Sequence, residues 1–389
     1  MKRILSIFML WAAVAVMPLW AQEPIQKAAV KEVEATVGQY KCAKQGSYMP
    51  SFASDRTDRP VKNVILMIGD GMGLATVATA MYANGGELTM TNLQTTGFVR
   101  TQSADSFTTD SAASGTAYAT GQKTYNNAVG LGADRNVIEN IPEKLEESGI
   151  VSGIVSTDNL DGATPSAFFA HQAHRNMSKE IWADMPMSKL TFFSAGSQEE
   201  FEKQPSSTVS AILDNFTVVH SADAKKAIKK SKRLGYLPPA SETTYKVKGR
   251  GNYLPETTEM AIEYLSARSD KGFFLMVEGA RIDKAAHSND YGSMIEETLD
   301  FDKAVEAAVR FAEQDGNTLV IISADHETGA VSLRSGDMEK GKVKGVYVSR
   351  GHTPIMVPLF AFGPHSMDFS GMQENSDVSN KIVDLLLGK

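Results

Sequence analysis

The chain has 389 residues, of which 42% are hydrophobic and 22% are charged, a composition typical of a globular protein with a sizeable core. Its 46 acidic and 39 basic residues give a formal net charge of −7, which argues against nonspecific binding to nucleic acid. Cys42 is the single cysteine, so an internal disulfide is excluded.

Residues 1–21 have the features of a secretory signal peptide. A basic start at Lys2 and Arg3 precedes an apolar run from Ile4, and the small residue Ala21 comes just before polar sequence. Without Lys2 and Arg3, 37 basic residues face 46 acidic ones, a net charge of −9. We expect an exported protein, periplasmic or secreted, with no membrane span after signal removal. A retained membrane anchor is the alternative, because the apolar run is near the lower length limit for a span.

The rest of the chain divides into a polar segment and one large domain. Residues 22–60 are polar and irregular and are predicted to form an arm or linker. Residues 61–389 are predicted to form one domain, and the more polar stretch 177–255 an insertion on it.

Strand-like and helix-like segments alternate along that domain. Hydrophobic runs that end in glycine or an acid indicate strands at 61–71, 150–158, 272–283 and 317–327, with a further strand at 355–364. Helices are predicted at 73–84, 111–120, 141–148, 256–268, 292–314 and 376–387. This alternation predicts an α/β fold, a three-layer α/β/α sandwich around a mostly parallel sheet.

Potential metal ligands gather at the ends of the predicted strands, where such sheets bind ligands. They are Asp70, Glu278 with Asp283, and Asp325 with His326, while Thr164 follows the strand at 150–158. Asp283 and His287 are four residues apart, which puts both on one face of a helical turn. A single acid after a strand is often only a turn former or a helix cap. The whole set together indicates a metal site.

Ser111 is a candidate nucleophile at the start of a predicted helix. It stands in TTDSAASGTAYATG, residues 108–121, directly after Asp110 and with no histidine nearby in sequence. A metal ion can acidify a coordinated alcohol as it acidifies water, so a metal would replace the missing base. Asp110 is then a helix-start or positioning residue. The small residues of this stretch also fit close helix packing.

Six motifs in order, MIGDGMG, TDSAASGTA, ATPSAFFAHQAHRN, VEGARIDKAAH, ADHETGA and GHT, make the chain resemble the alkaline phosphatase family over roughly residues 61–365. The resemblance implies that residues 61–389 are a catalytic domain. It implies metal-dependent hydrolysis of phosphate monoesters to alcohol and inorganic phosphate, through a phosphoserine intermediate on Ser111. It also implies a homodimer.

The same resemblance implies two Zn²⁺ and one Mg²⁺ per chain. Asp283, His287 and His352 would hold the first zinc. The second would be held by Asp70, Asp325 and His326, and Asp70 would bridge to magnesium, whose other protein ligands would be Thr164 and Glu278. Imidazole with carboxylate suits zinc, and oxygen-only ligation suits magnesium. The ions together exceed the charge of the four carboxylates by about two positive units, which would attract a phosphate dianion.

Two basic residues are implied at the substrate. Arg175 corresponds to the phosphate-binding arginine of the family, and its planar fork can pair with two phosphate oxygens. Lys284 either contacts phosphate through water or is an exposed lysine. The chain departs from the pattern at Gly162, where relatives carry an acid or a histidine near magnesium. Asp161, next to Gly162, is the candidate to replace that side chain near magnesium.

Two other functions compete with this interpretation. A phosphodiesterase or sulfatase of the same superfamily would share the two-zinc core. The sulfatase motif C-x-P-x-R or S-x-P-x-R is absent around Ser111, and diesterases generally lack the counterparts of Glu278 and Arg175. The other alternative is a noncatalytic protein that binds phosphate or metal, which would not need Ser111.

Overall fold

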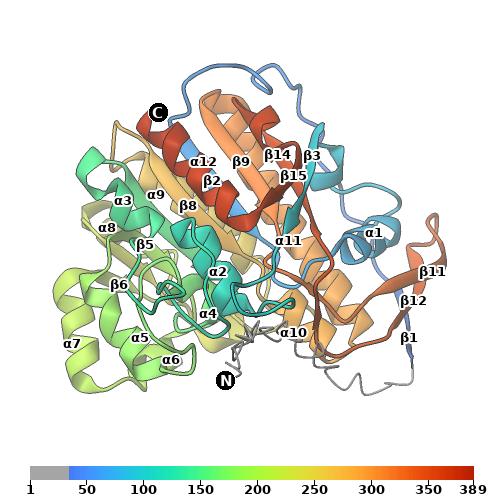
Figure 1. The fold of residues 1–389 in the computed structure, drawn as a ribbon, viewed down its shortest axis with the longest axis horizontal. Coiled ribbons are helices and arrows are strands. Elements are labelled where there is room, and N and C mark those ends of the chain that lie inside the picture. Colours follow the sequence, from blue (N-terminus) through green and yellow to red (C-terminus); the bar gives the residue numbers. More distant parts are fainter. Residues whose placement is uncertain (1–34) are drawn as a thin grey trace, which may run out of the picture.

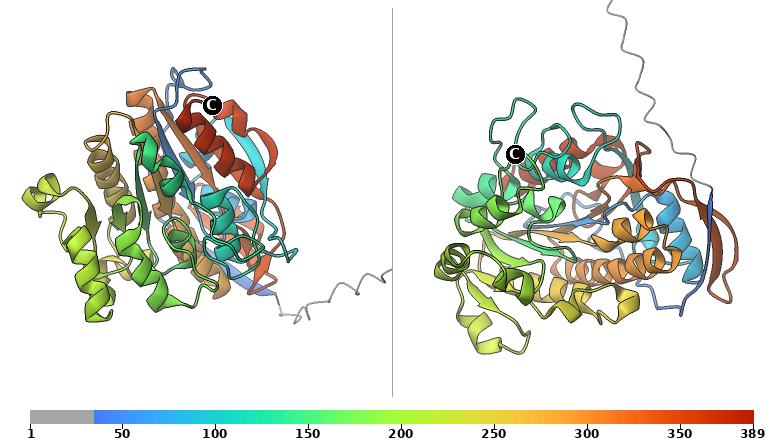
Figure 2. Two further views of the ribbon diagram at one scale, coloured as in Figure 1. Left: turned by 60° about the vertical axis from the view of Figure 1, so that its left-hand side comes forward. Right: turned by 90° about the horizontal axis from the view of Figure 1, so that it is seen from below.

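The computed structural model describes residues 35–389. The predicted signal peptide, 1–21, and the first part of the predicted arm lie outside the described residues. A ten-stranded sheet with the order β15-β3-β14-β9-β2-β8-β4-β5-β7-β6 forms the middle layer (Figure 1). One face of the sheet is covered by α2, α3, α4 and α12 and the other by α1, α9, α10 and α11 (Figure 2). This is the α/β/α sandwich expected from the sequence.

The five expected strands form the centre of this sheet. They are β2 (Asn63–Ile68), β4 (Val151–Ser156), β8 (Phe273–Glu278), β9 (Thr318–Ser323) and β14 (Val357–Phe362). The neighbours β9, β2, β8 and β4 are parallel, whereas β14 runs antiparallel to β9 and to β3 (Thr95–Arg100). Every residue of β2, β8 and β9 is buried, as expected for parallel strands covered on both faces.

The six expected helices all form, within three residues of the predicted ends. They are α1 (Leu74–Ala83), α2 (Ser111–Thr120), α3 (Ile141–Leu145), α9 (Tyr253–Ser266), α11 (Tyr291–Asp315) and α12 (Asn375–Leu387). Outside the segment 177–255, two short α-helices were not expected as separate elements, α4 (Ala163–Ser166) and α10 (Arg281–His287). The run at 272–283, expected as one strand, therefore ends as β8 at Glu278 and continues into α10. Among the helices of residues 35–389, none has the length and apolarity needed to cross a bilayer.

The segment 177–255 extends the central sheet at one edge. It supplies β5 (Leu190–Ser194), β6 (Thr217–Val219) and β7 (Leu234–Tyr236), all parallel to their neighbours. The helix α5 (Ser178–Asp184) precedes these strands, and between them in the sequence lie α6 (Gln198–Glu202), α7 (Ser206–Asn215) and α8 (Lys225–Lys230). The segment thus belongs to the same sandwich.

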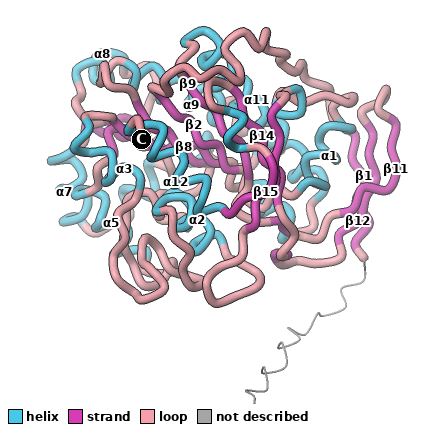
Figure 3. The backbone as a smooth tube through the Cα atoms, turned by 45° about the horizontal axis from the view of Figure 1, so that its top comes forward, coloured by secondary structure: helices cyan, strands magenta, loops and turns pink. Residues whose placement is uncertain are grey.

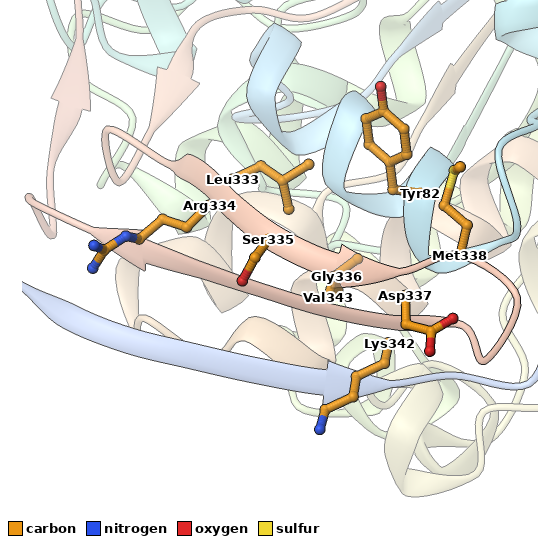
Figure 4. Close-up of a pocket in the computed structure, with 9 residues that line it drawn as sticks. All are labelled: Tyr82, Leu333, Arg334, Ser335, Gly336, Asp337, Met338, Lys342 and Val343. Carbon is orange, nitrogen blue, oxygen red and sulfur yellow. The ribbon is translucent and has the colours of Figure 1, made fainter.

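A small second sheet stands beside α1, away from the central sheet (Figure 3). Its middle strand β12 (Lys342–Tyr347) pairs antiparallel with β1 (Thr36–Lys41), from the predicted arm, and with β11 (Ser332–Asp337). Between β11 and α1 lies a groove of about 310 Å³, lined by Tyr82, Leu333, Arg334, Ser335, Gly336, Asp337, Met338, Lys342 and Val343 (Figure 4). None of the candidate ligands lines this groove.

The other edge of the central sheet is formed by β15 (Gly371–Glu374), which pairs parallel with β3. After β9, a three-residue loop that carries Asp325 and His326 leads into β10 (Glu327–Thr328), a two-residue strand that pairs with β13 (His352–Thr353). This short pairing brings the segment after β9 next to the segment before β14, beside the candidate site.

Candidate metal centre and active site

The candidate ligands meet at the carboxyl ends of β2, β8 and β9. In the sheet register, Ile68 at the end of β2 pairs with Glu278 on one side and with Ser323 on the other. Asp70 and Asp325 each lie two residues beyond these strand ends. The parallel register thus brings residues from three distant parts of the sequence to one edge of the sheet.

Asp70, Asp325 and His326, the residues expected at the second zinc, form one buried cluster. Their ligand atoms all lie within 4.8 Å of one another. His326 Nε2 is 3.5 Å from Asp70 Oδ1 and 3.1 Å from Asp325 Oδ2. The backbone N–H of Gly71 donates to the other oxygen of Asp325 at 3.0 Å, which leaves Oδ2 facing the cluster.

Asp283, His287 and His352, expected at the first zinc, form an adjoining cluster. His287 Nε2 is 3.3 Å from Asp283 Oδ2, and His352 Nε2 is 3.6 Å from Asp283 Oδ1. The ring of His352 also stacks on His326 with 3.5 Å between centroids. The ligand atoms of Asp283, His326 and His352 lie within 4.8 Å of one another, so His326 stands between the two clusters.

The imidazoles of this cluster are oriented as metal ligands. His287 Nδ1 donates to the carbonyl of Arg350 at 2.5 Å, and His352 Nδ1 to that of Thr109 at 2.9 Å. Each neutral ring then keeps its lone pair on Nε2. The two Nε2 atoms are 3.1 Å apart and both face Asp283. A divalent cation satisfies such a group of facing acceptors.

Three candidate ligands have a buried oxygen with no hydrogen-bond partner among residues 35–389. These oxygens are Asp70 Oδ1, Asp325 Oδ2 and Thr164 Oγ1. A buried polar atom left unsatisfied costs about 1–3 kcal/mol, so unsatisfied oxygens on three candidate ligands indicate a partner from outside the protein. The residues therefore fit the divalent cations implied by the sequence.

The charges of the site lead to the same conclusion. Burial, and then the negative charges of Asp325 and Asp283, raise the pKa of Asp70 well above its usual range. Burial, and then the charge of Asp158, raise the pKa of Glu278 to about 8. Carboxylates that repel one another in a buried site are stabilised by bound cations.

Ser111 lies at the start of α2 and faces these clusters. Its side chain is buried, and its Oγ is 3.2 Å from His326 Nε2. Asp110 caps the helix by accepting from Ala113 N–H at 3.0 Å, and its other oxygen lies 3.2 Å from Arg175 Nη1. Asp110 is thus a helix-start residue, as expected, and it also orients Arg175 beside the nucleophile candidate.

The packing of α2 also uses its small residues. A Cβ added at Gly115 would be 3.2 Å from the Cα of Thr164, so the glycine lets α2 press closely against α4. This contact fixes Ser111 and Thr164 relative to each other.

The structure brings in two residues that were not singled out from the sequence. Asp158 pairs with Lys284, and Thr328 donates from Oγ1 to Asp283 Oδ1 at 2.5 Å. Asp158 carried a usable signal, because it is an acid at the end of the run 150–158. Asp161, by contrast, accepts a hydrogen bond from Ser178.

Replacing Gly71 with alanine is expected to destabilise the protein by about 1–3 kcal/mol and to reduce the amount of divalent metal that it binds. Gly71 has a φ of +70°, and an added Cβ would be 2.8 Å from Thr328 Oγ1 and 2.9 Å from Asp283 Oδ1. Denaturant unfolding and metal analysis measure both effects. Gly46→Ala is the control, because no atom lies within 4 Å of a Cβ added there. Equal unfolding midpoints for the two variants would contradict the prediction.

Comparisons with known proteins show the family of this chain. The family model described as alkaline phosphatase matches residues 61–209 and 223–346. Alkaline phosphatase 3 of Bacillus subtilis is 32% identical, over 84% of this chain and 89% of that protein.

Two solved structures are similar along most of the chain. The alkaline phosphatase from the Antarctic bacterium TAB5 is 35% identical with a TM-score of 0.79, over 85% of this chain and 100% of that one. A mutant of that enzyme with magnesium bound in a site called M3 is 34% identical with a TM-score of 0.78, over 85% and 99% of the two chains. The present chain belongs to the alkaline phosphatase family.

Proposed function

We propose that the chain hydrolyses phosphate monoesters to an alcohol and inorganic phosphate through a phosphoserine on Ser111. As a member of the alkaline phosphatase family, it is a phosphate-ester hydrolase. The observation that carries the finer proposal is the position of Ser111 Oγ, 3.2 Å from His326 Nε2, between a cluster of metal-ligand side chains and Arg175. A noncatalytic phosphate-binding or metal-binding protein would not require a hydroxyl there.

Two Zn²⁺ and one Mg²⁺ are the proposed cofactors. The zinc ligands are Asp283, His287 and His352 for one ion and Asp70, Asp325 and His326 for the other; Asp70, Thr164 and Glu278 would hold magnesium. When bound, the ions would acidify the Ser111 hydroxyl and neutralise charge on the phosphate. The facing imidazole nitrogens and the three unpaired buried oxygens support this assignment.

The protein groups around Ser111 suit phosphoryl transfer. Ser111 Oγ attacks phosphorus and loses its proton, the ester oxygen departs and is protonated to the alcohol, and Ser111 carries the phosphoryl group. Water then attacks that phosphorus, which releases phosphate and returns the hydroxyl to Ser111. The N-terminus of α2 favours the anion through the helix dipole. Arg175, oriented by Asp110, can pair with two nonbridging oxygens.

Rates on a monoester and a diester, measured side by side, test the substrate class. We expect kcat/KM for the monoester to be higher by about 100-fold or more. Arg175→Ala is expected to lower the monoester value by about 10–100-fold, since a hydrogen bond to a charged group contributes about 1.5–3 kcal/mol. The diester carries one negative charge less, so Arg175→Ala should lower kcat/KM for the diester by a smaller factor.

Arg175→Lys is the matched control, because it keeps the charge and removes the planar fork. Its monoester rate should fall between those of the unaltered protein and Arg175→Ala. Faster turnover of the diester, or equal losses on both substrates in Arg175→Ala, would favour the phosphodiesterase alternative.

We also infer export to the periplasm or the medium, from the predicted signal peptide at residues 1–21, and a homodimer, from the family. N-terminal sequencing of the exported protein tests the first inference. Light scattering of the purified protein tests the second, and a monomer mass would reject it.

A further inference from the structure

Gly162 and Asp158 lie against each other in the loop between β4 and α4. A Cβ added at Gly162 would be 2.7 Å from Asp158 Oδ2 and 2.9 Å from its Cγ. Non-bonded carbons and oxygens do not approach so closely, so the Asp158 carboxylate occupies the space that a side chain at Gly162 would need. The φ of Gly162 is −57°, a value open to every residue type. An added Cβ would also be 2.9 Å from the carbonyl oxygen of Asn159, so the glycine makes room both for this backbone turn and for the Asp158 carboxylate.

The backbone holds Asp158 beside Glu278. Ser156 pairs with Glu278 in the sheet register and donates its hydroxyl to Glu278 Oε2. The same hydroxyl oxygen accepts from Asp158 N–H at 2.8 Å. The carbonyl of Asp158 accepts from Gly196 N–H at 2.6 Å, which fixes the loop from its other side.

The side chain of Asp158 contacts a residue of α10, the helix that carries two candidate ligands. Asp158 Oδ1 pairs with Lys284, the residue next to the candidate ligand Asp283. Thr164, two residues beyond Gly162, has a buried Oγ1 without a partner among the described residues. The loop and the first turn of α4 thus carry a carboxylate and an unsatisfied hydroxyl, and α4 packs against β8, the strand that ends at Glu278.

We propose that Asp158 is the carboxylate that holds the hydrated divalent cation beside Glu278 and Thr164, and that the missing side chain of Gly162 admits it. This inference rests on the magnesium site of the proposed function. Mg²⁺ usually keeps several of its waters and binds through few carboxylates, so one added carboxylate changes its affinity. Asp161, the candidate named from the sequence, bonds instead to Ser178.

Calorimetric titration of the zinc-loaded protein with Mg²⁺, in the absence of any ester, tests the proposal. Asp158→Asn, which keeps the shape and removes the charge, is expected to raise the Kd for Mg²⁺ at least tenfold. Asp161→Asn is the matched control and should stay within twofold of the unaltered protein. A Kd within twofold for Asp158→Asn, or no magnesium binding by the unaltered protein, would overturn the proposal.

Lys284→Gln tests whether Asp158 acts on magnesium directly or only through its ion pair with Lys284. It removes a positive charge next to the site, so magnesium should bind more tightly, opposite in sign to Asp158→Asn. If Lys284→Gln weakens binding as much as Asp158→Asn, the pair acts as a structural unit and the proposal fails.

Gly162→Ala tests the contact while leaving the Asp158 charge in place, and so does not depend on the folding of Asp158→Asn. We expect it to weaken magnesium binding at least threefold, because the added Cβ displaces the carboxylate. Unchanged binding would overturn the role of Gly162. Since every readout is made without an ester, failure to hydrolyse monoesters would leave these results standing.

Discussion

Replacing Ser111 with alanine is expected to lower kcat for a phosphate monoester by about 10³-fold or more while the zinc content stays unchanged. Ser111 Oγ is the hydroxyl placed 3.2 Å from His326 Nε2, and its loss removes the attacking oxygen. The carboxylates and imidazoles of both clusters remain. Steady-state rates measure kcat, and metal analysis measures the zinc content. Acid-quenched labelling with radioactive phosphate measures the phosphoserine, which should be absent from the variant.

Ser114→Ala is the matched control on the same helix. Ser114 Oγ donates to the carbonyl of Asp325 at 2.7 Å and accepts from Asn375 Nδ2 at 2.9 Å, so it supports the site without facing a substrate. This variant should lose about 1 kcal/mol of stability and keep both its label and kcat within a few-fold. Full turnover by zinc-loaded Ser111→Ala would instead reject the phosphoserine mechanism.

The central strands could be predicted because burial on both faces leaves a clear mark in the sequence. The strand β9 reads TLVIIS with every residue buried, a continuous apolar run that only a covered strand or a core helix tolerates. The strands β6 and β7 have three residues each, too few for a periodic pattern. In the sheet β7 pairs with β5 and β6 pairs with β7, and local sequence does not encode these pairings.

Some parts of the candidate site could likewise be predicted from the sequence, and others could not. An acid two residues past a buried strand, such as Asp70 or Asp325, can be predicted because parallel strands end at one edge. The direction in which a loop side chain points cannot be predicted in this way. Asp161 is adjacent to Gly162 in the chain, yet its carboxylate bonds Ser178, whereas Asp158, four residues earlier, folds back against the glycine.

Removal of the divalent ions is expected to lower Tm by about 5 °C for each tightly bound ion and to abolish turnover. An ion present at a thousand times its Kd stabilises the folded state by about 4 kcal/mol, and the entropy of unfolding of a chain of this length converts that to about 5 °C. Without cations, the buried carboxylates of Asp70 and Asp325 repel each other. Differential scanning calorimetry with a chelator, and then with zinc and magnesium restored, measures the change.

The Ser111→Ala variant provides the control for this experiment, because it keeps every proposed ligand and lacks only the nucleophile. Its Tm should fall with the chelator by as much as that of the unaltered protein, although it has no turnover to lose. That result separates the stabilising effect of the ions from their effect on the reaction. If the chelator leaves both Tm values unchanged, the facing nitrogens of His287 and His352 do not hold a cation, and the proposed metal centre is wrong.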